Sequence, residues 1–459
     1  MNYAKMIAFL DRTWTKASPI GTIDRYPFDE FQLLLAARGN PHLGMTTIHI
    51  TGSKGKGSVT AMTAALMRAH GVPCVTFTSP HLNAIEERIQ TGDGTSIDRE
   101  ELARRITELI AVSEQVGHDP RAIIRLLLVA TFEHARDNGV TAAAIEVSMG
   151  GRFDPTNVVD GTVTAITAIG MEHVPRLGLN VAEIAAQKVA IVKPGRICVI
   201  APQRADAMRV IEAGVALAGG RILETRELPD PLTTSNENAI GAATRYFEFT
   251  GSSEYVAGFK VRSFNSKGIV ADLATPFHSF ENVRIAIRGR HQAENAAVAL
   301  NAVEQGLATR GIRLDDRSVR AGLATVEWPG RLELLREMPP VVYDGAHTAE
   351  SAAVLAAALR DHFPNDRWTF VVGMLTRRDI GAILSELAPI ACEFIAVPVP
   401  GFDAVDPAEI AARAAPLGVP FDSAENVAAA LHRRKTTSIC ITGTLYLYTE
   451  SKQAVVEIS

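Results

Sequence analysis

Short apolar runs alternate along the chain with segments in which apolar side chains recur at helical spacing. Residues 46–51 are mostly β-branched and predict a short buried strand, whereas residues 59–70 carry apolar side chains at helical spacing and end before Gly71. Further strands are predicted at 73–78, 142–147, 162–170 and 197–201, and helices within 1–45 and at 96–116, 120–138 and 181–192. Strands that alternate with helices imply a mostly parallel, doubly wound α/β sheet, in which ligands bind at the carboxyl ends of the strands.

The pattern changes between about 230 and 287. A polar stretch at 233–238 precedes short alternating segments such as 245–249, which are typical of antiparallel hairpins. After a predicted helix at 291–307, Trp328-Pro329-Gly330-Arg331 marks a turn, and strands alternate with helices again. The strands of this second pattern are predicted at 341–347, 368–375, 393–400 and 438–447. We therefore expect a larger domain at 1–328, with its hairpin-rich part near 230–287, and a smaller α/β domain at 329–459.

Composition excludes several classes of protein. A chain of 459 residues is too long for one core, and 47% hydrophobic with 21% charged residues is typical of globular proteins. The net charge of -5 does not indicate the basic surface that nucleic-acid-binding proteins have. No apolar run is long enough to span a membrane. Four widely separated cysteines fit buried thiols in a reducing compartment, so we expect a cytoplasmic protein. They are Cys74, Cys198, Cys392 and Cys440.

A glycine-rich loop joins the first buried strand to the helix that follows it. Its sequence is Gly52-Ser53-Lys54-Gly55-Lys56-Gly57-Ser58. Strand, glycine loop and helix form a phosphate cradle, because glycines let backbone N–H groups approach the phosphates and the helix N-terminus adds a positive dipole end. Lys56 would reach the terminal phosphates and Ser58 would bind phosphate or magnesium. Gly57 separates the two, so the loop departs from the pattern G-x-x-x-x-G-K-[ST], and a turn that binds nothing is the alternative.

Other candidate side chains also follow predicted strands. Ser79 comes after the strand at 73–78, Glu146 lies at the end of the strand at 142–147, and His173 follows the strand at 162–170. Because the carboxyl ends of parallel strands meet at one edge of a sheet, we expect these residues near the glycine loop.

The motifs, taken in order, identify a resemblance. The motifs that carry it span nearly the whole chain: Gly39-Asn40-Pro41, the glycine loop, Ser79-Pro80-His81-Leu82, Glu146-Val147, Gly150-Gly151-Arg152, Thr156-Asn157-Val158-Val159, Lys188 with Lys193-Pro194-Gly195, Gly289-x-His291-Gln292-x-x-Asn295, Trp328 to Glu333, Asp344-Gly345-Ala346-His347 and Thr442 to Leu447. In these motifs the chain is similar to the folylpolyglutamate synthase/dihydrofolate synthase family, within the Mur ligase superfamily of ATP-dependent amide-forming ligases.

The resemblance implies a reaction and an architecture. ATP phosphorylates a substrate carboxylate, and the amine of glutamate then attacks the acyl phosphate. Such a ligase has a larger N-terminal P-loop doubly wound domain and a smaller C-terminal Rossmann-like α/β domain, with the active site in the cleft between them. The implied partners are small molecules, namely a folate or pteroate-like acid and glutamate, and the implied state is a monomer.

The resemblance also implies a metal site. Ser79, Glu146, His173 and Lys188 match the residues that hold two magnesium ions, with Lys188 carbamylated. A carbamate needs a neutral amine, and hence a lowered lysine pKa. The alternatives are a buried Glu146 paired with an arginine, a His173 without a role, and a solvated Lys188. Lys56, His173 and Lys188 are the expected catalytic residues.

Further matches imply nucleotide contacts beyond the loop. Asn295 would face the adenine, Arg331 the phosphates and Asp344 the ribose, and His347 belongs to the same motif. Each has a plainer alternative: a polar position on a helix face for Asn295, a linker charge for Arg331 and a turn acid for Asp344. Lys54 and Arg152 are also consistent with solvated cations.

The chain departs from the family's pattern at the substrate side. Thr348-Ala349 replaces Asn-Pro, Glu172 replaces Asp, and Ile124-Arg125 with Leu128 stands where the family carries Phe-Glu and Thr. Arg125 therefore reverses a charge on the side that faces the pterin, unless the helix is rotated and Arg125 is solvated. Two other functions stay open: a related ligase acting on a non-folate carboxylate, and a nucleotide-binding regulatory module.

Overall fold

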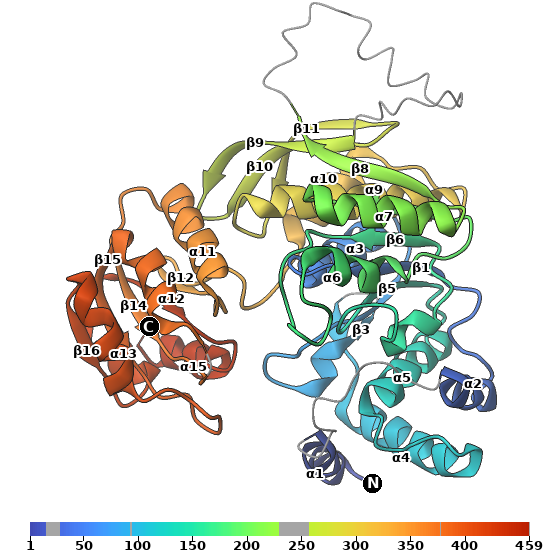
Figure 1. Ribbon diagram of the computed structural model, residues 1–459, viewed down its shortest axis with the longest axis horizontal. Coiled ribbons are helices and arrows are strands. Elements are labelled where there is room, and N and C mark those ends of the chain that lie inside the picture. The colour runs from blue at the N-terminus through green and yellow to red at the C-terminus, as the bar shows by residue number, and fades with distance from the viewer. Residues whose placement is uncertain (15–27, 92–93, 229–256, 377, 459) are drawn as a thin grey trace, which may run out of the picture. The chain divides into compact units, whose positions relative to one another are not determined.

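The computed structural model describes residues 1–14, 28–91, 94–228, 257–376 and 378–458 (Figure 1). The chain divides into two compact units. The first comprises residues 1–260, 272–283 and 293–326, and the second comprises 261–271, 284–292 and 327–459. The predicted stretches at 233–238 and 245–249 lie outside the described residues.

The first unit is organised around the parallel strands that the sequence predicts. The central strand β1 (Thr46–Thr51) pairs in parallel with β5 (Ala142–Glu146) on one side and with β6 (Val163–Ile166) on the other. Parallel pairing continues outward to β2 (Cys74–Phe77) and, on the other side, to β7 (Ile197–Ile200) and β8 (Arg221–Glu227). The mostly parallel, doubly wound sheet is therefore confirmed.

Further strands extend this sheet at both ends. The antiparallel pair β3 (Ile89–Thr91) and β4 (Thr95–Ser96) forms one edge. The other edge is formed by β9 (Ala257–Asn265), β10 (Gly268–Ala274) and β11 (Ser279–Ile285), which are neighbours in the sheet. Only two residues join β9 to β10. A connection this short can join neighbouring strands only if they are antiparallel. β9 and β10 thus form a hairpin, whereas the hairpin-rich part near 230–287 as a whole stays a prediction.

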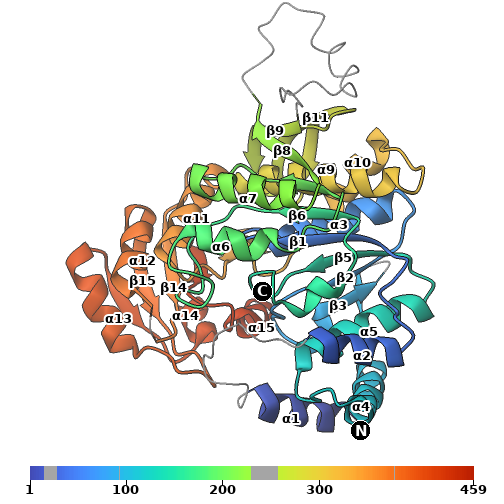
Figure 2. The same ribbon diagram turned by 45° about the vertical axis from the view of Figure 1, so that its right-hand side comes forward.

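Helices cover both faces of the sheet (Figures 1 and 2). Two buried clusters, which include Ile145 of β5 and Ile200 of β7, pack under α4, α5, α6 and α7. Helix α9 packs closely on β1, since a Cβ on Gly306 would lie 3.5 Å from Cδ1 of Ile48. The helices are α1 (Tyr3–Trp14), α2 (Phe28–Ala37), α3 (Lys56–Ala69), α4 (Arg99–Val116), α5 (Ile123–Asp137), α6 (Val181–Val189), α7 (Ala205–Leu217), α9 (His291–Ala308) and α10 (Asp316–Thr325).

Two helix starts differ from the sequence prediction. Helix α3 begins at Lys56 instead of Val59, because Gly55 adopts a left-handed conformation (φ 88°) directly before it. Helix α4 begins at Arg99 instead of Ser96, because the side chain of Asp98 accepts hydrogen bonds from the backbone N–H groups of Glu100 and Glu101. Lys56 and Ser58 consequently lie in the first turn of a helix.

The second unit has a sheet of its own. Its strand order is β12 (Glu333–Arg336), β13 (Val341–Tyr343), β17 (Ser438–Thr442), β14 (Trp368–Val372), β15 (Ala391–Ala396) and β16 (Phe421–Ser423), all parallel except β12. Buried side chains such as Trp368, Phe370 and Phe394 form its core. Its helices are α11 (Ala349–His362), α12 (Ile380–Leu387), α13 (Pro407–Ala414), α14 (Val427–Arg433) and α15 (Tyr448–Ile458). In the described part of the chain, no helix is long and apolar enough to cross a membrane.

Candidate active site

The glycine loop needs its glycines because other parts of the unit lie against it. A Cβ on Gly52 would lie 1.8 Å from Oγ1 of Thr167, and a Cβ on Gly55 would lie 2.4 Å from Oδ1 of Asn295. The second contact places the N-terminal part of α9 beside the loop. Asn295, a predicted nucleotide contact, is therefore next to the predicted phosphate cradle.

Two lysines converge on the start of this loop. The carbonyl oxygen of Gly52 accepts hydrogen bonds from Nζ of Lys56 at 3.0 Å and from Nζ of Lys188 at 2.8 Å. Lys188 is only 1% exposed, so the alternative of a solvated helix lysine is wrong. Burial and the charge of Lys56 lower the pKa of Lys188 to about 8, against the opposing effect of Glu172.

Glu172 supplies the carboxylate in this cluster. Its Oε1 lies 2.5 Å from Nζ of Lys188, and it follows β6, as predicted for His173. His173 is the next residue and has a left-handed backbone (φ 48°). The positive charges of Lys56 and Lys188 lower the pKa of Glu172, although burial acts the other way and is the largest effect.

A second carboxylate lies at the carboxyl end of β5. Glu146 is 3% exposed, and its Oε2 accepts a hydrogen bond from the backbone N–H of Ser79 at 3.0 Å. Ser79 follows β2, the neighbour of β5 in the sheet. The structure thus brings together two of the predicted metal ligands, which come from the ends of different strands.

Asp154 belongs to the same region and was missed by the sequence prediction. It is buried, and its carboxylate accepts hydrogen bonds from the backbone of Met149 (2.9 Å) and from Oγ1 of Thr156 (2.6 Å). Thr156 in turn contacts Nε2 of His49 in β1 at 2.9 Å. Burial raises the pKa of Asp154, and Lys56 opposes this effect. Its position two residues after the Gly150-Gly151-Arg152 motif was the available signal.

In the second unit, the predicted nucleotide residues form one cluster. The carboxylate of Asp344 accepts hydrogen bonds from the backbone N–H groups of Leu332 (2.9 Å) and Ala346 (2.8 Å). A Cβ on Gly345 would lie 3.2 Å from Nη1 of Arg331, and the ring of His347 contacts the carbonyl of Gly345 at 2.8 Å. Burial raises the pKa of Asp344, and Arg331 opposes it. A cleft that joins this cluster to the glycine loop stays a prediction.

Arg125 is not solvated, so that alternative is wrong. It is 4% exposed in the first turn of α5, and its guanidinium lies 5.5 Å from the ring centre of Phe31 in α2. Leu128, one turn later, is fully buried in the same core. Ile124 packs against this core as well, so all three departures on this helix contribute to packing.

The predicted magnesium ligands suit a hard cation. Carboxylate and hydroxyl oxygens are the donors that Mg²⁺ prefers, and Glu146 and Ser79 offer both. Among the described residues, no group of three or more His, Cys, Asp and Glu side chains could hold a metal ion. The predicted magnesium ligands include only two residues of these four types, Glu146 and His173. The other two predicted ligands are Ser79 and Lys188. Conversion of the Lys188 ammonium to a carbamate would replace a positive charge near the site by a negative one.

Comparisons with known proteins identify relatives over most of the chain. Residues 50–213 match the Mur ligase middle domain, and residues 330–444 match the Mur ligase glutamate ligase domain. The dihydrofolate synthase/folylpolyglutamate synthase of Bacillus subtilis is 30% identical over 78% of this chain and 77% of that protein. The corresponding protein of Mycobacterium tuberculosis is 31% identical over 83% of this chain and 75% of its own length.

A solved structure is similar along nearly the whole length. The folylpolyglutamate synthase of Mycobacterium tuberculosis, complexed with ADP and AMPPCP, superposes with a TM-score of 0.78 and 29% identity. The match covers 93% of this chain and 95% of the other. Both the order of the elements and the sequence therefore agree with these relatives.

Proposed function

The chain belongs to the dihydrofolate synthase/folylpolyglutamate synthase family, and we infer from this that it is an ATP-dependent ligase that joins glutamate to a folate or dihydropteroate carboxylate. The carboxylate oxygen attacks the γ-phosphorus of ATP, which releases ADP and leaves an acyl phosphate. The glutamate amine then attacks the acyl carbon, loses a proton and displaces inorganic phosphate, so that an amide bond forms.

The convergence of Lys56 and Lys188 on the carbonyl of Gly52 is the observation that best supports this chemistry. Phosphoryl transfer is accelerated chiefly by positioning and by neutralising negative charge on the transferring group. Lys56 brings a positive charge to the place where the loop would cradle the phosphates. Backbone N–H groups of the first turn of α3, together with Ser58, complete the cradle.

Lys188 would act in a modified form. Its lowered pKa makes the neutral amine accessible near neutral pH, and the amine nitrogen can then attack carbon dioxide and lose a proton to give a carbamate. Ser79, Glu146, His173 and the carbamate of Lys188 would hold magnesium, for which we propose two ions. When bound, magnesium neutralises charge on the transferring phosphoryl group.

The remaining predicted residues would bind the nucleotide. Asn295 would contact the adenine, which agrees with its position beside Gly55. Arg331, Asp344 and His347 would bind the phosphates and the ribose from the second unit. In this proposal Asp344 is held in place by two backbone N–H groups, so its carboxylate is already oriented before ATP binds.

A panel of acceptors tests the proposed function. Phosphate release is measured with ATP, glutamate and, in turn, dihydropteroate, reduced folates and unrelated carboxylic acids. We expect turnover that requires both glutamate and a pteroate or folate acceptor. Turnover with a non-folate acid alone would favour the related ligase, and nucleotide binding without turnover on any acceptor would favour a regulatory module.

Two further parts of the proposal concern the state of the protein in the cell. We propose a monomer in a reducing compartment such as the cytoplasm, since all four cysteines are free and three of them are buried. Size-exclusion chromatography with light scattering tests the first point. Fractionation of cells that express the tagged chain tests the second.

A further inference from the structure

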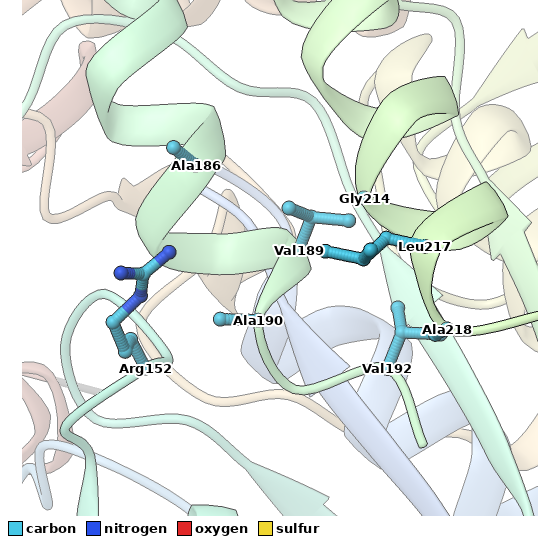
Figure 3. A pocket seen from close by; sticks show the side chains of 8 residues that line it. All are labelled: Arg152, Ala186, Val189, Ala190, Val192, Gly214, Leu217 and Ala218. Carbon is cyan, nitrogen blue, oxygen red and sulfur yellow. The ribbon is translucent and has the colours of Figure 1, made fainter. Parts of the chain in front are cut away.

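A hollow outside the proposed active site lies between helices α6 and α7. Its volume is about 250 Å³, slightly below the range of pockets that hold drug-sized ligands. Residues of α6 and the segment after it line one side, among them Ala186, Val189 and Val192, while Gly214 and Leu217 of α7 line the other (Figure 3). All the lining residues except Arg152 have apolar side chains or none.

Leu217 adds an apolar side chain to the lining of the hollow, and Arg152 adds a positive charge at its edge. Leu217 is 91% exposed, so its apolar side chain is accessible to solvent. Figure 3 shows the Arg152 side chain extended along α6 toward Ala186. Within the described part of the chain, no carboxylate pairs with the Arg152 guanidinium. An apolar lining with one unpaired cation at its edge is complementary to an anion that carries an apolar body.

The walls of the hollow are connected to Lys188. The backbone N–H of Arg152 donates a hydrogen bond to the carbonyl of Gln187 in α6 at 2.8 Å. A Cβ on Gly151 would lie 3.1 Å from Cα of Lys188, so the segment that carries Arg152 packs directly against that turn of the helix. Val189, which follows Lys188, lines the hollow and contacts Gly214 of α7.

We propose that this α6–α7 hollow is an effector site for a small organic anion with an apolar body. A bound ligand contacts Arg152 and Val189 together and therefore changes the placement of the helix turn that carries Lys188. The binding itself is independent of the proposed function, whereas the effect on catalysis rests on the ligase activity proposed above.

Fluorescence titration of the full chain tests the binding. The probe is 1-anilinonaphthalene-8-sulfonate, and its neutral analogue N-phenyl-1-naphthylamine lacks the sulfonate but keeps the apolar rings. We expect one saturable site that prefers the sulfonate, and an increase of about tenfold or more in the Kd of the sulfonate in Leu217→Asp. Arg152→Gln should weaken binding of the sulfonate but not of the neutral analogue.

Controls keep the result interpretable. Leu217 is exposed, so Leu217→Asp should fold, which circular dichroism and a thermal melt verify. Val456→Asp makes the same kind of change at an exposed apolar residue of the second unit and should leave the Kd unchanged. A Kd that neither Leu217→Asp nor Arg152→Gln alters would overturn the site, as would equal affinity for the two probes in the wild type.

Phosphate release tests the effector role. The saturating sulfonate should change the rate of the wild type by about twofold or more and have little effect on Leu217→Asp at the same concentration. An unchanged wild-type rate with the probe bound overturns the effector role. A chain that binds the probe but turns over no acceptor would instead contradict the proposed function.

Discussion

The carboxylate of Glu172 lies 2.5 Å from the ammonium group of Lys188, in a buried position where a second lysine, Lys56, is also close. Burial, the largest cause, and the charge of Lys56 lower the pKa of Lys188, although the carboxylates of Glu172 and Asp154 act the other way. The lowered pKa makes the neutral amine, which a modification of Lys188 would require, more accessible.

Lys188→Ala should lose ligase activity and recover part of it when acetate or another short carboxylic acid is added, because the acid replaces the missing carbamate oxygens. Lys188→Arg should be inactive without such recovery, since a guanidinium stays protonated and still fills the site. Phosphate release with and without the acid measures the recovery. Full activity of Lys188→Ala, together with an unmodified lysine in the intact mass, would remove the carbamate from the proposal.

Lys56→Ala should lower phosphate release by roughly a hundredfold or more, because loss of one donor to the developing charge costs about 3 kcal/mol. Circular dichroism should show an intact fold. Lys267→Ala, at an exposed lysine of the β9–β10 turn, serves as the matched control and should keep its activity. Normal turnover in well-folded Lys56→Ala would show that the loop does not bind the reacting phosphate.

Gly55→Ala should raise the KM for ATP or abolish turnover, because the added methyl group would lie 2.4 Å from Oδ1 of Asn295. Gly71→Ala is a close control, since Gly71 also has a positive φ (72°) but has no neighbouring atom within 4 Å. Both variants carry the strain of a left-handed alanine, about 1 kcal/mol. Equal kinetics in the two variants would argue against an ATP site formed by this loop and Asn295.

Glu294, beside Asn295 in α9, should make stability depend on pH. Burial raises the pKa of Glu294 from 4.5 to about 7, so the folded state holds this proton over a range in which the unfolded chain releases it. The free energy of unfolding of the wild type should therefore fall, relative to Glu294→Gln, as the pH rises from about 4.5 to about 7. Urea denaturation at several pH values measures the difference, and parallel curves would refute it.

Arg125→Glu should destabilise the first unit by about 2 kcal/mol or more, because it removes a cation from the face of Phe31 and buries a carboxylate there. Arg121→Glu, an exposed arginine just before the same helix, should cost much less. Chemical denaturation compares the two. If Arg125→Glu is as stable as the wild type but changes the ratio of turnover on dihydropteroate and folate, Arg125 shapes the acceptor pocket.

The sequence alone determined those features that depend on local order. Short apolar runs between helical segments predicted the strands at 46–51 and 142–147, and their parallel pairing followed from the helices between them. The glycine loop was predicted from its composition and its place between strand and helix. These signals are carried by neighbouring residues, so no knowledge of long-range packing is needed to read them.

Only the tertiary structure decided the environment of each candidate residue. Lys188 and Arg125 both look like ordinary helix cations in the sequence, yet both are buried, the first against Gly52 and Glu172 and the second on Phe31. The hydrophobic pattern did not mark Asp154, although its carboxylate accepts hydrogen bonds from Met149 and Thr156 in the segment beside the glycine loop. Desolvation and charge pairing arise from contacts between residues distant in the chain, and a local pattern carries no information about which distant groups will meet.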